Sequence, residues 1–409
     1  MKYTITTLKE LERQYGSPLY IFKQDEFIQN YHQFVECFQN AYSRYKLSYS
    51  YKTNYTPAIC KVVKMLGGYA EVVSDMEYMV AKRLGYDNNQ IIYNGPYKGK
   101  LAEEHILNGG ILNIDNLQEV ERVCAIARAN PEKSLEVGIR VNIDIGQNFI
   151  SRFGVDTDGR DLDIAIRKIN EVSNLNLVGL HCHIGQSRTI EAWKRRVNQM
   201  LQLADKYFEK PPEYLDLGSG MFAKMERVLA EQFGSNIPDF SDYAKAVAEP
   251  IARHYAEYTE NERPILFTEP GTTIINSYID FIGKVDSLKA VKGKQFAVMN
   301  CSKDNIGDIC KIKKLPIEII HNSDTLMQCV DLDFVGYTCL EHDVMYTGFY
   351  GELSVGDFVV YANVGGYSNV SKPPFIAPNC AMISIQDNKE TSIIKRAESF
   401  EDVFVTYKF

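Results

Sequence analysis

Apolar and polar residues follow two different periods along the first 270 or so residues of the chain. Short runs rich in β-branched, aromatic and Leu residues predict strands, because these side chains pack well on a pleated sheet. Between the runs, apolar residues recur every three or four positions, as in helices with one buried face. The expected strands are the segments 46–52, 69–73, 91–95, 111–114, 137–143, 177–184, 214–220 and 265–271.

Capping and turn residues mark where the helices between these strands begin and end. Ser74 is followed three residues later by Glu77, a spacing typical of a capping box at a helix start. Gly85 is expected to end that helix. Eight short strands that alternate with helices predict an α/β protein built on a (β/α)8 barrel.

The pattern changes after Gly271. From there on apolar and polar residues mostly alternate, and Gly-Asp and Gly-Gly pairs mark turns, which is typical of a β-rich domain. Near the N-terminus, the segment 17–22 has the character of one isolated strand. We therefore predict a barrel domain over residues 29–273 and a β-rich domain over 274–409 that also takes in residues 1–28.

Composition excludes several classes of protein. The chain has 409 residues, of which 45% are hydrophobic and 24% are charged, as in ordinary globular proteins. Its net charge of −8 gives no basic surface for nucleic acid. No segment approaches the ~20 apolar residues of a membrane span, and the first ten residues lack the apolar core of a signal peptide. Nine scattered cysteines without a Cys-x-x-Cys pair indicate free thiols, so a cytoplasmic protein is expected.

Charged and potentially reactive residues follow the predicted strands. Active sites of (β/α)8 barrels form at the C-terminal ends of the strands, so residues there should meet at one mouth. An aldehyde cofactor that bears a phosphate would fit such a mouth, which would contain an amine, carboxylates, an arginine, an imidazole and a glycine-rich turn. The residues at these ends are Lys52, Glu71, Asn94, Arg140, His183, Gly218, Ser219, Gly220 and Glu269.

Each of these features alone also has an ordinary structural interpretation. Lys52 could be a surface lysine at a strand end, Arg140 could form an ion pair, and Gly-Ser-Gly is common in tight turns. His181 and His183 alternate along a strand, so they share a face and could bind a metal. The other histidines fall in helical stretches or in the β-rich part, which leaves too few ligands at the mouth. We therefore expect no metal.

Several longer motifs resemble one known family when taken in series. The chain is similar to the fold-type III pyridoxal-phosphate decarboxylases, which include diaminopimelate, ornithine and carboxynorspermidine decarboxylases. The resemblance extends from "SPLYIF" to "PPFI", nearly the whole chain. The motifs are "YSYKTN", "GLHCHIGQS", "YLDLGSGM", "LFTEPGT", "VGYTCLEHD" and "VGDFVVYANVGGYS".

The resemblance implies pyridoxal 5'-phosphate as the cofactor and assigns residues to it. Lys52 would hold the cofactor as a Schiff base, His183 would stack on its ring, and Glu269 would pair with the ring nitrogen. Cys339 would cross a homodimer interface and act near the α-carbon of the substrate in a shared active site. The other implied cofactor contacts are Glu71, Arg140, Gln186, Gly218, Ser219, Gly220, Gly271 and Tyr367.

The chemistry of decarboxylation explains why these residue types are needed. Loss of CO2 leaves electron density at the α-carbon, which a conjugated imine with a protonated pyridine ring can absorb. A carboxylate such as Glu269 favours that ring proton. Lys52 must lose a proton to attack an aldehyde, so its amine is needed at the end of a buried strand. Cys339 and Lys52 are the candidates that return a proton to the α-carbon.

The chain departs from the family pattern where the far end of a substrate would bind. Thr272 replaces an Arg that follows Glu-Pro-Gly, and Leu315 stands where the family has the Arg of an Arg-Pro pair. Leu340 takes the place of an acid, although Glu341 could shift to receive a distal amine. The positions expected to contact the substrate are Thr272, Leu315, Leu340, Glu341 and Asp343. We predict a substrate other than diaminopimelate, with a neutral distal part.

The predicted protein is a pyridoxal-phosphate-dependent decarboxylase, a carbon–carbon lyase of amino-acid metabolism that releases CO2 from an amino acid or amino-acid conjugate. A racemase on the same scaffold is the nearest alternative, but alanine-type racemases favour an arginine at the ring nitrogen, and Glu269 argues against it. A non-catalytic carrier or regulator that retains pyridoxal phosphate is a further alternative.

Overall fold

The computed structural model describes residues 2–147, 149–234, 236–307, 309 and 312–409. The chain divides into two compact units, each described by itself below. The barrel unit comprises Tyr31–Phe222 and Pro238–Thr273, and the sheet unit comprises Met1–Asn30, Ala223–Ile237 and Ile274–Phe409. The segment 223–237, which the sequence pattern placed in the barrel domain, groups with the sheet unit.

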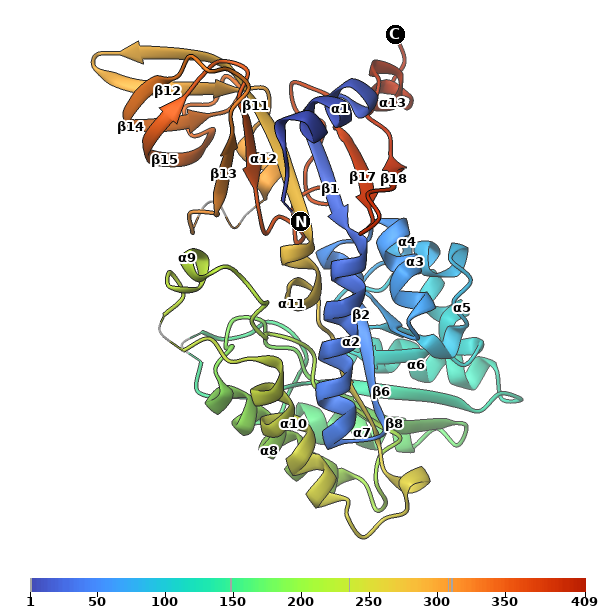
Figure 1. Cartoon of the computed structure of the whole chain (residues 1–409). Helices are drawn as coiled ribbons and strands as arrows, with labels where there is room; N and C mark the ends of the chain where they lie inside the picture. The colour runs from blue at the N-terminus through green and yellow to red at the C-terminus, as the bar shows by residue number, and fades with distance from the viewer. Residues whose placement is uncertain (1, 148, 235, 308, 310–311) are drawn as a thin grey trace. The chain divides into compact units, whose positions relative to one another are not determined.

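Eight parallel strands close into a barrel in the first unit (Figure 1). Each strand pairs with the next along the chain, and β10 returns to pair with β2. The predicted fold and all eight predicted strands are therefore confirmed, while the short β7 (Val155–Asp156) adds to the edge of β6. The barrel strands are β2 (Tyr45–Ser50), β3 (Tyr69–Val72), β4 (Ile91–Tyr93), β5 (Ile111–Ile114), β6 (Leu135–Asn142), β8 (Leu175–His181), β9 (Tyr214–Asp216) and β10 (Ile265–Thr268).

Helices alternate with these strands, as their periodicity predicts. At the start of α4, the Ser74 hydroxyl accepts a hydrogen bond from the backbone N–H of Glu77, which confirms the expected cap. The Glu77 carboxylate instead accepts from the backbone N–H of Val73, so the cap is not the reciprocal box that the spacing predicts. The helices are α2 (Gln24–Ala41), α3 (Pro57–Met65), α4 (Asp75–Arg83), α5 (Leu101–Leu107), α6 (Leu117–Ala129), α7 (Asp161–Asn170), α8 (Ile190–Tyr207) and α10 (Phe240–His254).

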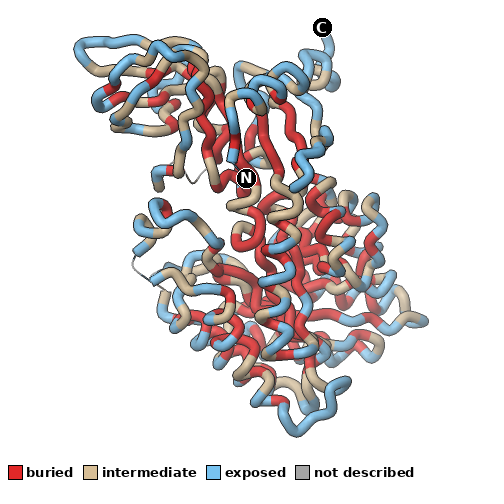
Figure 2. The backbone as a smooth tube through the Cα atoms, in the orientation of Figure 1, coloured by how far each residue is buried: buried red, intermediate tan, exposed pale blue. Residues whose placement is uncertain are grey.

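The interior of the barrel is filled by aromatic and aliphatic side chains. Ile92, Tyr214 and Phe267 form a buried cluster. Gly138 and Gly179 make room for the Tyr214 ring, because an added Cβ would lie 2.1 and 2.3 Å from its atoms. Figure 2 shows the barrel strands as buried backbone. The barrel is thus a packed core.

The sheet unit contains one mixed sheet of nine strands. Strand β1 lies between β11, to which it is antiparallel, and β17, to which it is parallel. Helix α1 (Ile5–Tyr15) packs Leu8 and Leu11 on this sheet. The strands are β1 (Leu19–Lys23), β11 (Ile279–Val291), β12 (Lys294–Met299), β13 (Ile317–Ile320), β14 (Met327–Val335), β15 (Val344–Leu353), β16 (Phe358–Tyr361), β17 (Ala381–Ile385) and β18 (Thr391–Lys395).

Short helical turns complete the two units. Among the described residues, no helix is both long and apolar enough to cross a lipid bilayer. The expected cytoplasmic location stays a prediction. The short elements are α9 (Arg227–Ala230), α11 (Thr272–Ile275), α12 (Lys303–Ile306), α13 (Phe400–Phe404), and the 3-10 turns η1 (Tyr51–Thr53), η2 (Asn88–Gln90), η3 (Glu260–Glu262) and η4 (Asn276–Tyr278).

Candidate active site

The amine of Lys52 is held at the C-terminal end of β2 by a buried carboxylate. Lys52 lies in the turn η1, and its Nζ is 2.8 Å from Oε2 of Glu71 on the adjacent strand β3. The Ser50 hydroxyl donates to the same oxygen at 2.5 Å. The side chain of Glu71 is 1% exposed and that of Lys52 is 28% exposed, so the amine remains accessible while its partner is not.

Burial governs the protonation of Glu71. Loss of water raises the pKa of Glu71, the Lys52 ammonium lowers it, and the Glu269 carboxylate raises it further. The net result is a raised pKa. A carboxyl group with a raised pKa beside an amine can take up the proton that the amine loses.

Glu269 follows β10 and is surrounded by hydrogen-bond donors. Its Oε2 is 2.8 Å from Nδ1 of His183, and its Oε1 accepts a hydrogen bond from Nδ2 of Asn94. Nε2 of His181 lies 3.1 Å from Oε1. Burial alone would raise the pKa of Glu269, but the two histidines outweigh it and hold the pKa well below its usual value. The residue is therefore a carboxylate at neutral pH.

Both histidines beside Glu269 are neutral at neutral pH. Burial lowers the pKa of His183 to about 4, and it also lowers the pKa of His181. A neutral His183 that donates from Nδ1 presents a flat, uncharged ring, of which 21% of the side chain is exposed. This ring is suited to stacking against another aromatic ring.

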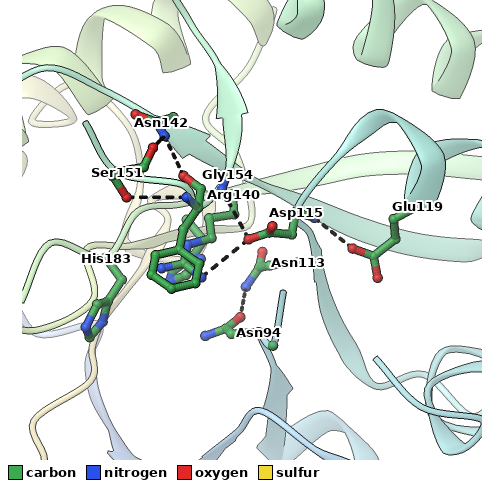
Figure 3. A network of polar contacts seen from close by, with 12 residues as sticks. Asn94, Asn113, Asp115, Glu119, Arg140, Asn142, Ser151, Gly154 and His183 are labelled. Atoms are coloured by element: carbon green, nitrogen blue, oxygen red, sulfur yellow. Dashed lines mark hydrogen bonds and ion pairs between the residues drawn. The ribbon is translucent and has the colours of Figure 1, made fainter. Parts of the chain in front are cut away.

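Arg140, at the end of β6, has a fixed position in a polar network (Figure 3). Its Nη1 is 3.4 Å from Oδ1 of Asp115, which also accepts from the backbone N–H of Gly154 at 3.1 Å. The guanidinium lies 4.7 Å from the centre of the Phe153 ring. The ion-pair interpretation of Arg140 therefore holds, and the pair lies at the same strand ends as the other candidates.

A second part of the network supports Asn94. Asn113 donates from its amide to Oδ1 of Asn94 at 2.7 Å, as Figure 3 shows, and Tyr214 donates to Oδ1 of Asn113 at 2.7 Å. This chain fixes the orientation of the Asn94 amide, so that its N–H points at Glu269.

The Gly-Ser-Gly turn after β9 packs against the segment after β8. Gly218 and Gly220 have φ of +62° and +106°. An added Cβ would lie 2.4 Å from the Cys182 carbonyl oxygen at Gly218 and 2.3 Å from that of Ile184 at Gly220. Close backbone packing thus requires both glycines whatever the turn binds. The Gly218 carbonyl accepts from the backbone N–H of Glu269 at 2.8 Å, which ties the turn to that residue.

Three further predicted residues lie in the barrel unit. Gly271 is buried, and an added Cβ there would lie 2.0 Å from Oγ1 of Thr53, in the turn that carries Lys52. Thr272 is half-buried at the start of α11, and Gln186 is exposed. The barrel unit therefore brings Lys52, Glu71, Asn94, Arg140, His183, the Gly218–Gly220 turn, Glu269 and Gly271 to the strand ends, as predicted.

The remaining predicted residues belong to the sheet unit, and their roles at the site stay predictions. Cys339 is exposed between β14 and β15, as are Leu340 at 37% and Glu341. Leu315 is only 1% exposed, and Tyr367 is 40% exposed with φ of +54°.

Asp343 has partners within its own unit. Its Oδ2 accepts from the Thr338 hydroxyl at 2.6 Å, and its Oδ1 accepts from the backbone N–H of Lys303 at 2.8 Å. The side chain is 3% exposed, so these bonds indicate that it shapes the turn that presents Cys339.

Sequence reasoning did not assign a role to His181 or Asp216. Asp216 is fully buried, and its pKa is raised well above the usual value by burial and by the charge of Glu269. The alternation of His181 with His183 was a usable signal, and Asp216 stands two residues before Gly218, whose backbone N–H it accepts at 2.9 Å.

Unused polar atoms show that the mouth can accept a ligand. Oε1 of Glu71, Oδ2 of Asp216 and Nδ1 of His181 are buried and have no hydrogen-bond partner among the described residues. Native proteins rarely leave such atoms unpaired. An accessible amine, a charged carboxylate and a flat imidazole fit an aldehyde on a pyridine ring. Ligand atoms of His181, Asp216 and Glu269 also lie within 4.8 Å of one another, so the expected absence of a metal stays a prediction.

Comparison with known proteins defines the class. The family model described as "Pyridoxal-dependent decarboxylase, pyridoxal binding domain" matches residues 25–276. The chain belongs to this family. The match confirms the resemblance noted in the sequence, together with the decarboxylase class and the pyridoxal cofactor.

The relatives extend the likeness to almost the whole chain. Diaminopimelate decarboxylase from Aquifex aeolicus is 25% identical over 413 residues, which cover 97% of this chain and 92% of the relative. The same-named enzyme of Methanocaldococcus jannaschii is 24% identical, with 96% and 92% covered. A crystal structure of diaminopimelate decarboxylase from M. jannaschii has a TM-score of 0.83 at 22% identity, with 98% and 94% covered. Lysine decarboxylase from Selenomonas ruminantium has a TM-score of 0.75 at 21% identity, with 95% and 97% covered. These structures share the fold.

Proposed function

We propose that Lys52 binds pyridoxal phosphate covalently and that the protein removes CO2 from an amino acid whose distal part is neutral. The proposal is carried by the pairing of the Lys52 amine with the buried carboxylate of Glu71. The same barrel unit also places a charged Glu269 at its strand ends. A surface lysine would not have a buried carboxylate directed at its amine, nor would that carboxylate be fixed by a buried hydroxyl.

Glu71 and Ser50 prepare the amine of Lys52. Glu71 accepts a hydrogen bond of 2.8 Å from Nζ, and the Ser50 hydroxyl donates to the same Glu71 oxygen and holds it in place. The raised pKa of Glu71 allows it to receive a proton from the ammonium. Lys52 reacts with an aldehyde only after this proton has left, since the free amine is the nucleophile.

Glu269 maintains a negative charge where a protonated ring nitrogen would lie. Pyridoxal phosphate, when bound, supplies the electron sink that decarboxylation requires. The His183 contact uses one lone pair of Oε2, and a carboxylate oxygen offers two, so Oε2 can still accept a further hydrogen bond. A carboxylate in this position favours the protonated ring nitrogen by charge pairing.

The distal part of the substrate is inferred from the neutral positions Thr272, Leu315 and Leu340. A charged group placed against Thr272 or Leu340, the two of these residues that are not fully buried, would lose roughly 1–3 kcal/mol for each missing polar partner. The names of the relatives favour a second candidate, diaminopimelate, and the M. jannaschii enzyme has a structure in co-complex with L-lysine.

The proposal also includes a homodimer, with Cys339 crossing the interface between the two subunits. Light scattering, which measures the mass of the protein in solution, tests for the dimer.

The experiment joins cofactor trapping to a substrate screen. Purified protein is incubated with pyridoxal phosphate, treated with borohydride and digested, and the modified peptide is identified by mass spectrometry. We expect the label on Lys52 and none on Lys52→Ala protein. Lys46→Ala is the matched control, because Lys46 is exposed on β2, the strand that leads into the turn of Lys52. A label that persists in Lys52→Ala protein at an unchanged level would refute the assignment.

The screen measures CO2 release from diaminopimelate, lysine, ornithine and amino acids with uncharged distal parts. We expect the highest kcat/KM among the uncharged group. A higher value for diaminopimelate would replace the neutral-substrate proposal with the second candidate, and inversion of a stereocentre without CO2 release would indicate a racemase.

A further inference from the structure

Arg196 is a fully buried arginine whose charge meets backbone carbonyls. It lies in α8, and its exposed fraction is 0%. Nη1 donates to the carbonyl oxygens of Leu217 at 2.9 Å and Ser219 at 2.7 Å, and Nη2 donates to that of Ile184 at 2.7 Å. Within the part of the chain that the structure describes, no carboxylate forms an ion pair with it. Such burial of an arginine is costly and needs a specific explanation.

The neighbouring Trp193 belongs to the same arrangement. Its ring centre is 3.9 Å from the Arg196 guanidinium carbon, and its Nε1 donates to the Gly220 carbonyl at 3.1 Å. Two side chains of α8 therefore hold four carbonyls from two segments, the turn after β9 and the segment after β8.

The carbonyls that accept hydrogen bonds from Arg196 and Trp193 determine the direction of the N–H groups of the residues that follow them. In a trans peptide unit, the C=O of one residue and the N–H of the next point in opposite directions. The carbonyls of Ile184, Ser219 and Gly220 point toward α8, so the N–H groups of Gly185, Gly220 and Met221 point away from it. None of these three N–H groups donates a hydrogen bond to another described residue.

These N–H groups without a partner among the described residues come from adjacent backbone segments. A Cβ at Gly220 would lie 2.3 Å from the Ile184 carbonyl oxygen, so the two segments are in direct contact. Neighbouring unpaired N–H groups that share a direction form a concave anion site, and a buried cation behind them adds to its positive potential. Burial lowers the pKa of Arg196 to about 10, so the guanidinium stays charged at neutral pH.

We propose that Arg196 is a positioning residue that turns the backbone N–H groups of Gly185, Gly220 and Met221 toward the phosphate of the cofactor. Arg196 acts through the backbone and does not itself touch the ligand. The inference rests on the proposed function, because it needs a phosphate ester at this turn.

The test compares two ligands that differ only in the phosphate. Dissociation constants for pyridoxal 5'-phosphate and for pyridoxal are measured by absorbance titration in wild-type, Arg196→Met and Arg196→Lys proteins. We expect Arg196→Met to weaken binding of the phosphorylated ligand by at least tenfold, on the order of one lost charge-assisted hydrogen bond, while pyridoxal binding changes less than about threefold. Arg196→Lys should lie between, because a point charge keeps the potential but cannot hold three carbonyls.

Two further variants keep the result decisive. Arg195→Met is the matched control, since the Arg195 side chain is 55% exposed on the same helix and should change neither constant. If Arg196→Met protein does not fold, Trp193→Phe still removes the bond to Gly220 and should give a smaller loss that remains specific for the phosphate.

Each outcome has a defined meaning. Equal weakening of both ligands in the folded variants, or no weakening of either, would show that Arg196 stabilises the fold alone. Wild-type protein that binds neither ligand would overturn the proposed function and this inference with it, whereas wild-type binding without phosphate selectivity in the variants overturns only the inference.

Discussion

The buried neutral histidine His105 makes the barrel unit acid-sensitive by an amount that can be calculated. His105 lies in α5 with 0% exposure, and its Nε2 is 3.0 Å from the Ile111 carbonyl oxygen. Burial lowers its pKa from 6.5 to about 4. Because the folded-state pKa is the lower one, the unfolded chain binds more protons between these values. The stability due to a neutral His105 is complete above pH 6.5 and is lost as the pH falls toward 4.

The separation between the two pKa values gives the size of the effect. One pH unit corresponds to about 1.4 kcal/mol, so full titration removes about 3.4 kcal/mol, of which about 2 kcal/mol is lost at pH 5. His105→Gln protein lacks this titration but can retain a donor for the Ile111 carbonyl. We therefore expect the free energy of unfolding to fall between pH 7.5 and pH 5 by about 2 kcal/mol less in His105→Gln than in wild-type protein.

The chain provides its own reporter for this measurement. Trp193 is the single tryptophan, and it is fully buried in the barrel unit, so its fluorescence follows unfolding of that unit in urea. His32→Gln is the matched control, because His32 is exposed and its loss should leave the pH dependence unchanged. An equal fall in wild-type and His105→Gln proteins would refute the reasoning, since the acid sensitivity would then come from other groups.

Two more predictions concern the proposed site. Glu269→Gln removes the charge beside the ring nitrogen but keeps the shape of the side chain. We expect kcat to fall by roughly 10² or more, while the dissociation constant for pyridoxal phosphate changes little. An unchanged kcat in a saturation assay would contradict the role of Glu269. Gly220→Ala places a Cβ 2.3 Å from the Ile184 oxygen and should weaken cofactor binding in an absorbance titration. Gly109→Ala is the control and should not weaken it, because no atom lies within 4 Å of a Cβ at that position. Equal effects of the two substitutions would show that close packing at the turn is unimportant for cofactor binding.

The sequence predicts the candidate site because barrel topology converts order along the chain into proximity. Lys52, Glu71 and Glu269 are far apart in sequence, yet each lies in, or directly after, the C-terminal half of a short apolar strand. In a closed parallel barrel, such ends lie on one rim. Recognising the strands was therefore sufficient to bring these residues together, and the pairs Lys52–Glu71 and His183–Glu269 are direct contacts in the structure.

The contacts that fix these residues could not be predicted in the same way. Arg196 has the helical spacing of the apolar residues Trp193 and Met200, so the period places it on the buried face of α8, where an arginine is rarely found. Its burial depends on the carbonyls of two distant turns, which no helical period encodes. The segment 223–237 likewise follows a barrel strand along the chain, but its contacts are with the sheet unit, and contact preferences of this kind are set only in the folded state.

The three buried carboxyl groups of the site show that environment, more than residue type, selects the group that can face a cationic ring. Burial raises the pKa of Glu71, Asp216 and Glu269 alike, and each would become neutral if nothing opposed it. Glu269 is contacted by two histidines and an asparagine amide, and these contacts outweigh burial. Asp216 has one backbone N–H, and the charge of Glu269 raises its pKa further. The negative charge is therefore concentrated on Glu269, while Asp216 can remain neutral beside it and Glu71 is left to exchange a proton with Lys52.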